Sequence, residues 1–115
     1  MKDDNKGKQA DFSHRIFNFI DLRDKNLRYA IFSNSIFEFS AFDNSDLAYA
    51  DLSCSKFHKC SFENVYFKDV DISHAYLSNI CFNSASLIGV DLTSSDYIKY
   101  IDCRYSYLYK KIVFI

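Results

Sequence analysis

Side chains that could bind a metal or act as nucleophiles are few and widely spaced in this chain of 115 residues. The four cysteines form no C-x-x-C pair, which favours reduced thiols over a disulfide framework: Cys54, Cys60, Cys81 and Cys103. His14, Cys54 and His74 are separated by multiples of twenty residues. A metal site needs three or four converging ligands, and at this spacing only Cys54 and His74 would be neighbours. We therefore expect no metal site.

Motifs for catalysis are missing from the sequence as well. It contains no glycine-rich phosphate loop, no nucleophile elbow and no histidine with a suitably spaced partner. The chain is therefore predicted not to be an enzyme, with no catalytic or cofactor-binding residue and no cofactor.

Carboxylates form the largest group of polar side chains at a regular spacing. Asp11, Asp51, Asp71 and Asp91 are all separated by multiples of twenty residues. An aspartate beside a turn can accept hydrogen bonds from its own backbone, so this group has a structural explanation that needs no partner. The four carboxylates can share one surface only if the chain coils once every twenty residues.

Large apolar residues recur at every fifth position. Eighteen successive positions follow this rule: Phe12, Phe17, Leu22, Leu27, Phe32, Phe37, Phe42, Leu47, Leu52, Phe57, Phe62, Phe67, Ile72, Leu77, Phe82, Leu87, Leu92 and Tyr97. Two residues before each of them the side chain is usually small, as at Ala30, Ser40 and Ala50. Neither a helix nor a straight strand keeps a period of five on one side, so the chain must bend every five residues.

Four such sides would close a square coil of twenty residues. The blocks at that spacing agree column by column: ADFSH at 10–14, AIFSN at 30–34, ADLSC at 50–54, VDISH at 70–74 and VDLTS at 90–94. In particular, Ser13, Ser33, Ser53, Ser73 and Thr93 would form one ladder, which a period of fifteen or twenty-five would scramble.

With these repeats the chain resembles the pentapeptide-repeat family, whose pattern is A(D/N)Lxx. The residue before the large apolar one fits that pattern at several positions: Asp21, Asn26, Asp46, Asp51, Asp71, Asp91 and Asp96. The resemblance covers residues 9–100. It implies an all-β fold, a right-handed quadrilateral β-helix of about four to five coils with a C-terminal cap.

Both ends depart from the repeat. Arg15 and Lys25 occupy small inward positions of the first coil, so we expect a frayed first rung or side chains that reach outward. Residues 1–8 are polar and predicted to be disordered or weakly ordered. Asp102 ends the frame, and the apolar residues of 101–115 predict a cap and a possible dimerisation segment.

Two outward clusters are candidates for binding a protein partner. The first is the column Asp11, Asp51, Asp71 and Asp91, since members of the family that protect DNA gyrase, known for quinolone resistance, are thought to mimic nucleic-acid phosphates. The second is an apolar patch of Ile16, Phe19, Ile36 and Phe39, with Tyr29 and Tyr49 in a neighbouring column. The resemblance thus suggests a type II topoisomerase partner, and the patch suggests a structural scaffold or an effector or targeting module.

Composition limits the other partners. The formal net charge of −1 argues against a dedicated binder of nucleic acid or of anionic membranes. No apolar segment is long enough for a membrane helix, and the first residues lack the hydrophobic stretch of a signal peptide. We therefore expect a cytoplasmic protein of bacterial type, without a membrane span and without direct contact to nucleic acid.

Overall fold

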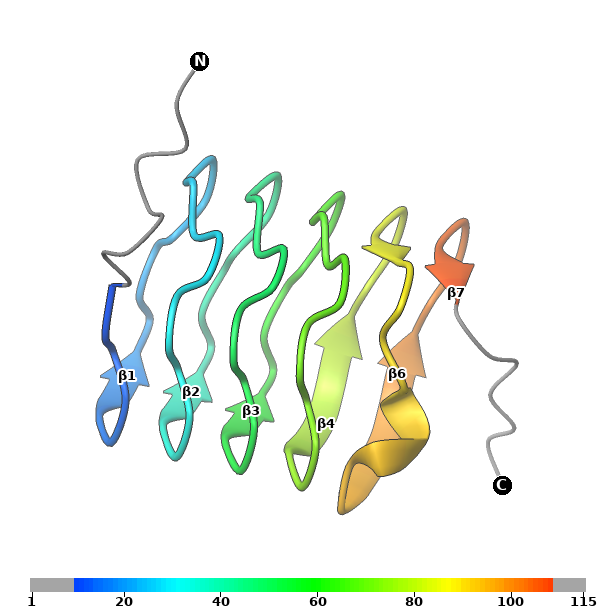
Figure 1. Cartoon of the computed structure of the whole chain (residues 1–115). Coiled ribbons are helices and arrows are strands. Elements are labelled where there is room, and N and C mark those ends of the chain that lie inside the picture. Colours follow the sequence, from blue (N-terminus) through cyan, green and yellow to red (C-terminus); the bar gives the residue numbers. More distant parts are fainter. Residues whose placement is uncertain (1–9, 109–115) are drawn as a thin grey trace.

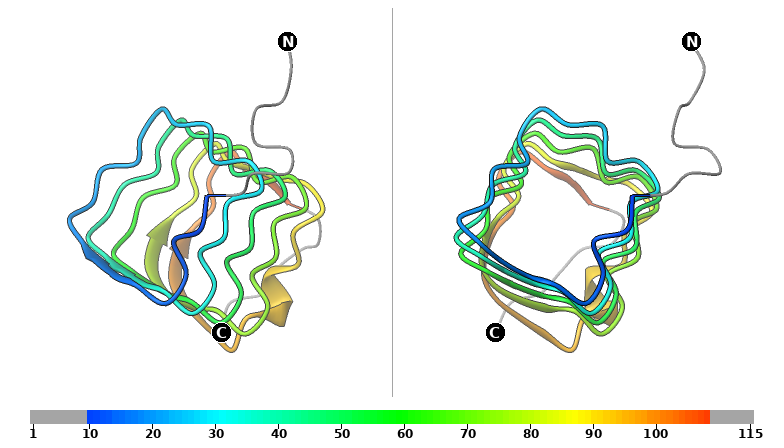
Figure 2. Two further views of the ribbon diagram at one scale, coloured as in Figure 1. Left: turned by 60° about the vertical axis from the view of Figure 1, so that its left-hand side comes forward. Right: turned by 90° about the vertical axis from the view of Figure 1, so that its left-hand side faces the viewer.

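The computed structural model describes residues 10–108, which form a right-handed parallel β-solenoid of square cross-section (Figures 1 and 2). The regular elements are β1 (Ile16–Asn18), β2 (Ile36–Glu38), β3 (Lys56–His58), β4 (Tyr76–Cys81), β5 (Ser86–Leu87), the 3₁₀ helix η1 (Leu92–Ser94), β6 (Tyr97–Asp102) and β7 (Tyr107–Leu108). One sheet has the order β1-β2-β3-β4-β6, and β5 pairs with β7. No helix in the described range is long and apolar enough to cross a membrane. The predicted fold class is confirmed.

The predicted coil of twenty residues is visible in the strand register. Ile16 pairs with Ile36, Ile36 with Lys56 and Lys56 with Tyr76, all in parallel. Single bridges such as that between Asp51 and Asp71 follow the same step of twenty on another side of the square. Parallel pairing satisfies the backbone groups between neighbouring coils, which a solenoid without helices needs throughout.

The corners of the square explain how a chain with two glycines can turn so often. Within residues 10–108, seventeen non-glycine residues have a positive φ, and most follow one another at intervals of five, for example Asn34 (59°), Phe39 (54°) and Asn44 (63°). This left-handed conformation costs an L-residue roughly 1–2 kcal/mol. The solenoid accepts that cost at nearly every corner because the coil-to-coil hydrogen bonds and the buried side chains impose the turn.

Large apolar side chains fill the interior. From Leu27 to Leu92 every predicted inward position is buried. Rings stack from coil to coil, as in Phe37 over Phe57, with ring centroids 5.1 Å apart, and Phe42 over Phe62 at 4.7 Å. In the first coil Phe12, Phe17 and Leu22 are only partly buried.

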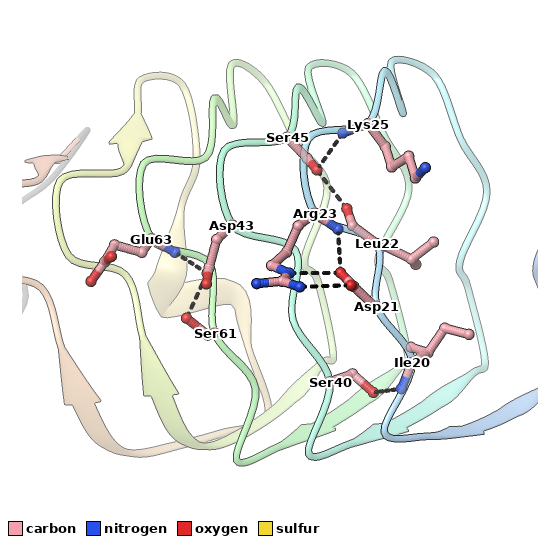
Figure 3. Close-up of polar contacts among 10 residues, drawn as sticks. All are labelled: Ile20, Asp21, Leu22, Arg23, Lys25, Ser40, Asp43, Ser45, Ser61 and Glu63. Atoms are coloured by element: carbon pink, nitrogen blue, oxygen red, sulfur yellow. Dashed lines mark hydrogen bonds and ion pairs between the residues drawn. The ribbon is translucent and has the colours of Figure 1, made fainter.

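Three buried serines of the second coil bind the backbone of the first, and Figure 3 shows two of them, Ser40 and Ser45. The hydroxyls of Ser35, Ser40 and Ser45 accept hydrogen bonds from the N–H groups of Arg15, Ile20 and Lys25 at 3.4, 3.1 and 3.0 Å. The side chains of Arg15 and Lys25 are themselves exposed, so the structure supports the prediction that they reach outward.

Replacing Ser45 with alanine is expected to lower the free energy of unfolding by about 1–3 kcal/mol, the usual cost of leaving buried polar groups without partners. The Ser45 hydroxyl also donates to the Leu22 carbonyl at 2.6 Å, so two backbone groups lose a partner. Urea denaturation followed by circular dichroism measures the change. Ser33→Ala is the control, because Ser33 makes no side-chain hydrogen bond within residues 10–108. Equal losses in the two variants would contradict the role of Ser45.

The repeat frame shifts by one residue near the C-terminal end, which corrects the sequence prediction. Between β4 and β6 the register is twenty-one, with Tyr76 opposite Tyr97 and Leu77 opposite Ile98. Tyr97 therefore stands on the outer side of the strand, and Ile98 takes the inward position predicted for Tyr97. The extra residue is accommodated at η1, where Ser94 and Ser95 donate backbone hydrogen bonds to Asp91 and Leu92.

The solenoid also continues past residue 100, where the repeat region was predicted to end. β6 reaches Asp102, and β7 pairs with β5 through Tyr107 and Leu108. Residues 101–108, predicted as part of the cap, thus belong to the last coil. The remainder of the predicted cap and dimerisation segment, 109–115, and the N-terminal residues 1–9 lie outside the described residues.

Candidate functional site

The outward side chains of one solenoid side form an acidic face, defined here by residues 10–14, 30–34, 50–54, 70–74 and 90–94. Asp11, Asp51, Asp71 and Asp91 all lie on it, as the spacing predicted. Bridges connect Asp11 with Ile31, Ile31 with Asp51, and Asp51 with Asp71. Ile31 therefore interrupts the column after Asp11, whereas Asp51, Asp71 and Asp91 follow one another on successive coils.

Each of these carboxylates is held by the residue two positions later. In Asp51 and Asp71 one oxygen accepts the backbone N–H of Ser53 or Ser73 at 2.9 Å and the hydroxyl of the same serine at 2.6 or 2.7 Å. Asp11 with Ser13, and Asp91 with Thr93, repeat this pair of contacts. The structural explanation for the aspartates is thus correct, and it also fixes the direction of the carboxylates.

The acidic face carries four aspartates, and His14 and His74 lie at one of its corners. Hydrogen bonds from the hydroxyl and the backbone N–H of Ser13 lower the pKa of Asp11 below its ordinary value. The five segments that define the face contain no lysine or arginine. Nδ1 of His74 lies 3.0 Å from Oδ1 of Asp96, which follows the last segment of the face. The aspartates of the face can attract cationic groups of a partner.

On another side of the solenoid the structure brings together the predicted apolar patch of Ile16, Phe19, Ile36 and Phe39. Ile16 is 70% exposed, Phe19 76% and Phe39 44%. The two phenylalanine rings stack with centroids 5.1 Å apart and planes 9° from parallel. Ile16 and Ile36 are paired residues of β1 and β2.

The two tyrosines predicted to adjoin this patch lie elsewhere. Tyr29 and Tyr49 occupy corners ten residues after Phe19 and Phe39. Since each side of the square takes five residues, ten residues lead to the opposite corner. The tyrosine rings stack at 5.0 Å and are half-buried, with the guanidinium of Arg28 5.4 Å from the Tyr49 ring centroid. They border the acidic face and are not part of the apolar patch.

A second group on the same side as the patch was missed by sequence reasoning. Lys56 and Lys59 lie on and directly after β3, and Lys99 lies on β6. Three tyrosines accompany them, Tyr76 on β4 and Tyr97 and Tyr100 on β6. We call one side of the solenoid the lysine–aromatic face: the outward residues of the strand triplets 16–18, 36–38, 56–58, 76–78 and 97–99, with the corner residue that follows each triplet. Aligning the sequence in blocks of twenty places the outward residues of β1, β2, β3 and β4 in common columns. The overall charge of −1, by contrast, gives no sign of a side rich in lysine.

Ion pairs elsewhere are mostly local. Asp21 accepts the Arg23 side chain at 2.8 Å, and this hydrogen bond, together with that from the Arg23 backbone, lowers the pKa of Asp21 (Figure 3). Asp102 and Arg104 repeat the arrangement in the last coil, where the hydrogen bond from the Arg104 side chain lowers the pKa of the Asp102 carboxyl. These pairs connect residues two apart on exposed turns and form no binding site.

The cysteines and histidines do not converge. All four cysteines are free, and within residues 10–108 no group of three or more His, Cys, Asp or Glu side chains could hold a metal ion. Cys54 is exposed. Cys60 is buried with its thiol 3.4 Å from the Phe37 carbonyl, and burial raises its pKa to about 11.

We expect iodoacetamide to modify Cys54 in the folded chain well before Cys60. The reactive species is the thiolate, and Cys60 is both inaccessible and hard to deprotonate at mildly alkaline pH. Mass spectrometry of digests taken over time measures the two rates. In urea the rates should become similar. Rapid modification of Cys60 in the folded chain would contradict its inward position.

Comparisons with known proteins agree with this geometry. The family model described as pentapeptide repeats matches eight copies over residues 26–64. No curated protein sequence matches the chain. Among solved structures, QnrB1, a plasmid-mediated fluoroquinolone resistance protein, is similar with a TM-score of 0.60 and 18% identity, over 87% of this chain and 50% of that one. The chain thus spans half the length of that protein.

A second solved structure is a pentapeptide repeat protein, Rfr23, from the cyanobacterium Cyanothece 51142. It matches with a TM-score of 0.47 and 20% identity, over 82% of this chain and 63% of that one. The repeat match, the period of five over the described coils and the square solenoid lead to one conclusion. The chain belongs to the pentapeptide-repeat family.

Proposed function

We propose that this chain is a non-enzymatic cytoplasmic protein that binds a type II topoisomerase through its acidic face. One observation carries the proposal: Asp51, Asp71 and Asp91 recur every twenty residues on a face without lysine or arginine, and a bridge pairs Asp51 with Asp71 on neighbouring coils. Resemblance to gyrase-protecting members of the family names the partner, and a fluoroquinolone resistance protein shares the fold.

The physical basis is a rigid row of negative charge. Neighbouring coils are spaced about 4.8 Å apart, as paired strands are, so the carboxylates form a closely spaced anionic line. Ser53, Ser73 and Thr93 hold the three carboxylates in one direction before any partner arrives. A topoisomerase groove that receives DNA is lined with cationic groups, and complementary charge speeds association and selects the orientation of the complex.

A gyrase supercoiling assay, with and without a quinolone, tests this function. At micromolar concentration the wild-type chain should inhibit supercoiling or relieve the effect of the drug. The triple variant Asp51→Asn, Asp71→Asn and Asp91→Asn should lose that effect, because asparagine removes the charge yet can still accept the hydrogen bonds of the turn. Asp43→Asn, on a different side, is the control and should act like wild type.

Two outcomes would contradict the proposal. In one, the wild-type chain changes neither supercoiling nor drug sensitivity. In the other, the triple variant remains as active as wild type, which would show that the acidic face is not the working surface.

A second candidate function is favoured by the exposure of the apolar patch. The side chains of Ile16 and Phe19 are 70% and 76% exposed, whereas the inward apolar side chains of the same coil are partly buried. We propose as the alternative a scaffold or targeting module that docks through this patch. A homodimer through the C-terminal segment remains a further proposal, since 109–115 lie outside the described residues.

A further inference from the structure

Exposed apolar side chains are concentrated on the lysine–aromatic face. The described residues include eight exposed large hydrophobic side chains, of which five lie on this face: Ile16, Phe19, Phe39, Tyr76 and Tyr100. The other three, Tyr66, Ile88 and Tyr105, belong to the remaining sides and corners. The face is also the one built on the five-stranded sheet β1-β2-β3-β4-β6. Exposed apolar side chains thus lie on or beside four of the five strands of this sheet, with Lys56 and Lys59 of the β3 rung between them.

Basic residues accompany the apolar ones. Ammonium groups lie above ring centroids in three places: Lys56 over Tyr76 at 5.4 Å, Lys59 over Phe39 at 5.3 Å and Lys99 over Tyr100 at 5.1 Å. Within the described part of the chain none of the three lysines forms an ion pair with a carboxylate. Glu38 is the one acidic residue among the outward positions of the five strand triplets and their corners. The fold thus places these lysines on one side and the aspartates of the acidic face on another, although positive and negative charges nearly cancel over the whole sequence.

Ring geometry indicates which anionic partner fits. Tyr76 stacks on Tyr97 at 4.2 Å with planes 8° apart, and Phe19 stacks on Phe39 along the same direction. Lys56 and Lys59 come from the coils on the other side of Tyr76 and Phe39, so these two rings are covered on both faces. Single-stranded nucleic acid binds by stacking its bases on open ring faces. Phe39 and Tyr76 offer no open ring face of this kind, which favours a flat partner that is both apolar and anionic.

We propose that the lysine–aromatic face docks on the surface of an anionic lipid bilayer. Ile16, Phe19 and Phe39 would enter the boundary between headgroups and acyl chains, as the apolar side chains of interfacial helices do. Lys56, Lys59 and Lys99 would contact lipid phosphates, and the tyrosines suit the headgroup level. The inference gives the apolar patch of the second candidate function a partner, and it does not depend on topoisomerase binding.

Vesicle flotation with the full chain tests the proposal. The chain should float with vesicles of mixed phosphatidylcholine and phosphatidylglycerol, much less with phosphatidylcholine alone, and binding should weaken with salt. Phe19→Asp with Phe39→Asp should abolish flotation. Replacing Lys56, Lys59 and Lys99 by glutamine should weaken binding to mixed vesicles about fivefold per lysine. Ile88→Asp, an equally drastic change at another exposed side chain, should float like wild type.

Several results would overturn the proposal. The first is no flotation with mixed vesicles. The second is an equal loss in the Ile88→Asp control, which would indicate general destabilisation. The third is binding of a single-stranded oligonucleotide or an acidic protein to this face without any vesicle binding. Circular dichroism of each variant checks the fold. Because the flotation assay contains no topoisomerase, its failure leaves the supercoiling result unaffected.

Discussion

Replacing Phe62 with alanine should lower the free energy of unfolding by about 3–5 kcal/mol, among the largest effects of a single truncation. Phe62 is 1% exposed. Its ring stacks on Phe42 at 4.7 Å and on Phe82 at 5.4 Å, and it meets Phe57 and Phe67 edge-on or tilted. The coil-to-coil hydrogen bonds hold the surrounding backbone, so the cavity left by the ring cannot close. Urea denaturation followed by circular dichroism measures the loss.

Tyr66→Ala is the matched control for Phe62→Ala. Tyr66 is an aromatic residue on the same coil, but its side chain points outward and is 39% exposed. Its truncation should cost roughly 1 kcal/mol or less. Similar losses in the two variants would mean that the rings inside the solenoid do not carry its stability.

Replacing Gly89 with alanine should destabilise the solenoid by about 2–5 kcal/mol, because two costs combine. Gly89 has a φ of 77°, where a residue with a Cβ pays roughly 1–2 kcal/mol. A Cβ at this position would also lie 1.9 Å from Oδ1 of Asp69 on the preceding coil, and such overpacking typically costs about 1–3 kcal/mol. Thermal and urea denaturation would both report the change.

Removing the neighbouring side chain separates these two costs. In an Asp69→Ala background, Gly89→Ala should lose only the conformational part, so the two substitutions should be coupled in a double-mutant cycle. Additive effects would show that contact with Asp69 is not what requires glycine at this corner. Other corners, such as Asn64 and Asn79, tolerate a Cβ in the same conformation.

Most of the fold follows from the sequence because one rule repeats. A large inward residue at every fifth position identifies the sides, and the Ser13 to Thr93 ladder identifies the coil of twenty. Both are physical requirements of stacked coils, since residues at n and n+20 must pack on one another. The acidic face was predictable for the same reason.

The shift at η1 was hidden because the apolar pattern has two solutions there. Tyr97 continues the period of five from Leu92, yet Ile98 is also apolar and one residue later. Hydrogen bonds decide between them: the Asp91 and Leu92 carbonyls accept from Ser94 and Ser95, which tightens the chain into a 3₁₀ turn. A count of apolar residues at every fifth position does not detect this local competition between a turn and a strand.

Surface clusters were harder to predict than the interior. The two pairs Phe19 and Phe39, and Tyr29 and Tyr49, have the same spacing of twenty residues. The tyrosines nevertheless lie at the opposite corner, because ten residues carry the chain across two sides of the square. The lysines of β3 and β6 were overlooked because a chain-wide charge of −1 says nothing of how four sides divide it. The side of the solenoid on which a charged residue lies depends on its position within the twenty-residue coil.

Competition binding with purified DNA gyrase tests the central functional claim most directly. The chain is immobilised, gyrase is added, and duplex DNA is titrated into the complex while bound gyrase is recorded. We expect the wild-type chain to capture gyrase, DNA to displace the bound gyrase, and the triple variant of Asp51, Asp71 and Asp91 to capture little. Capture that DNA leaves unchanged, or that survives loss of the three carboxylates, would contradict binding through the acidic face.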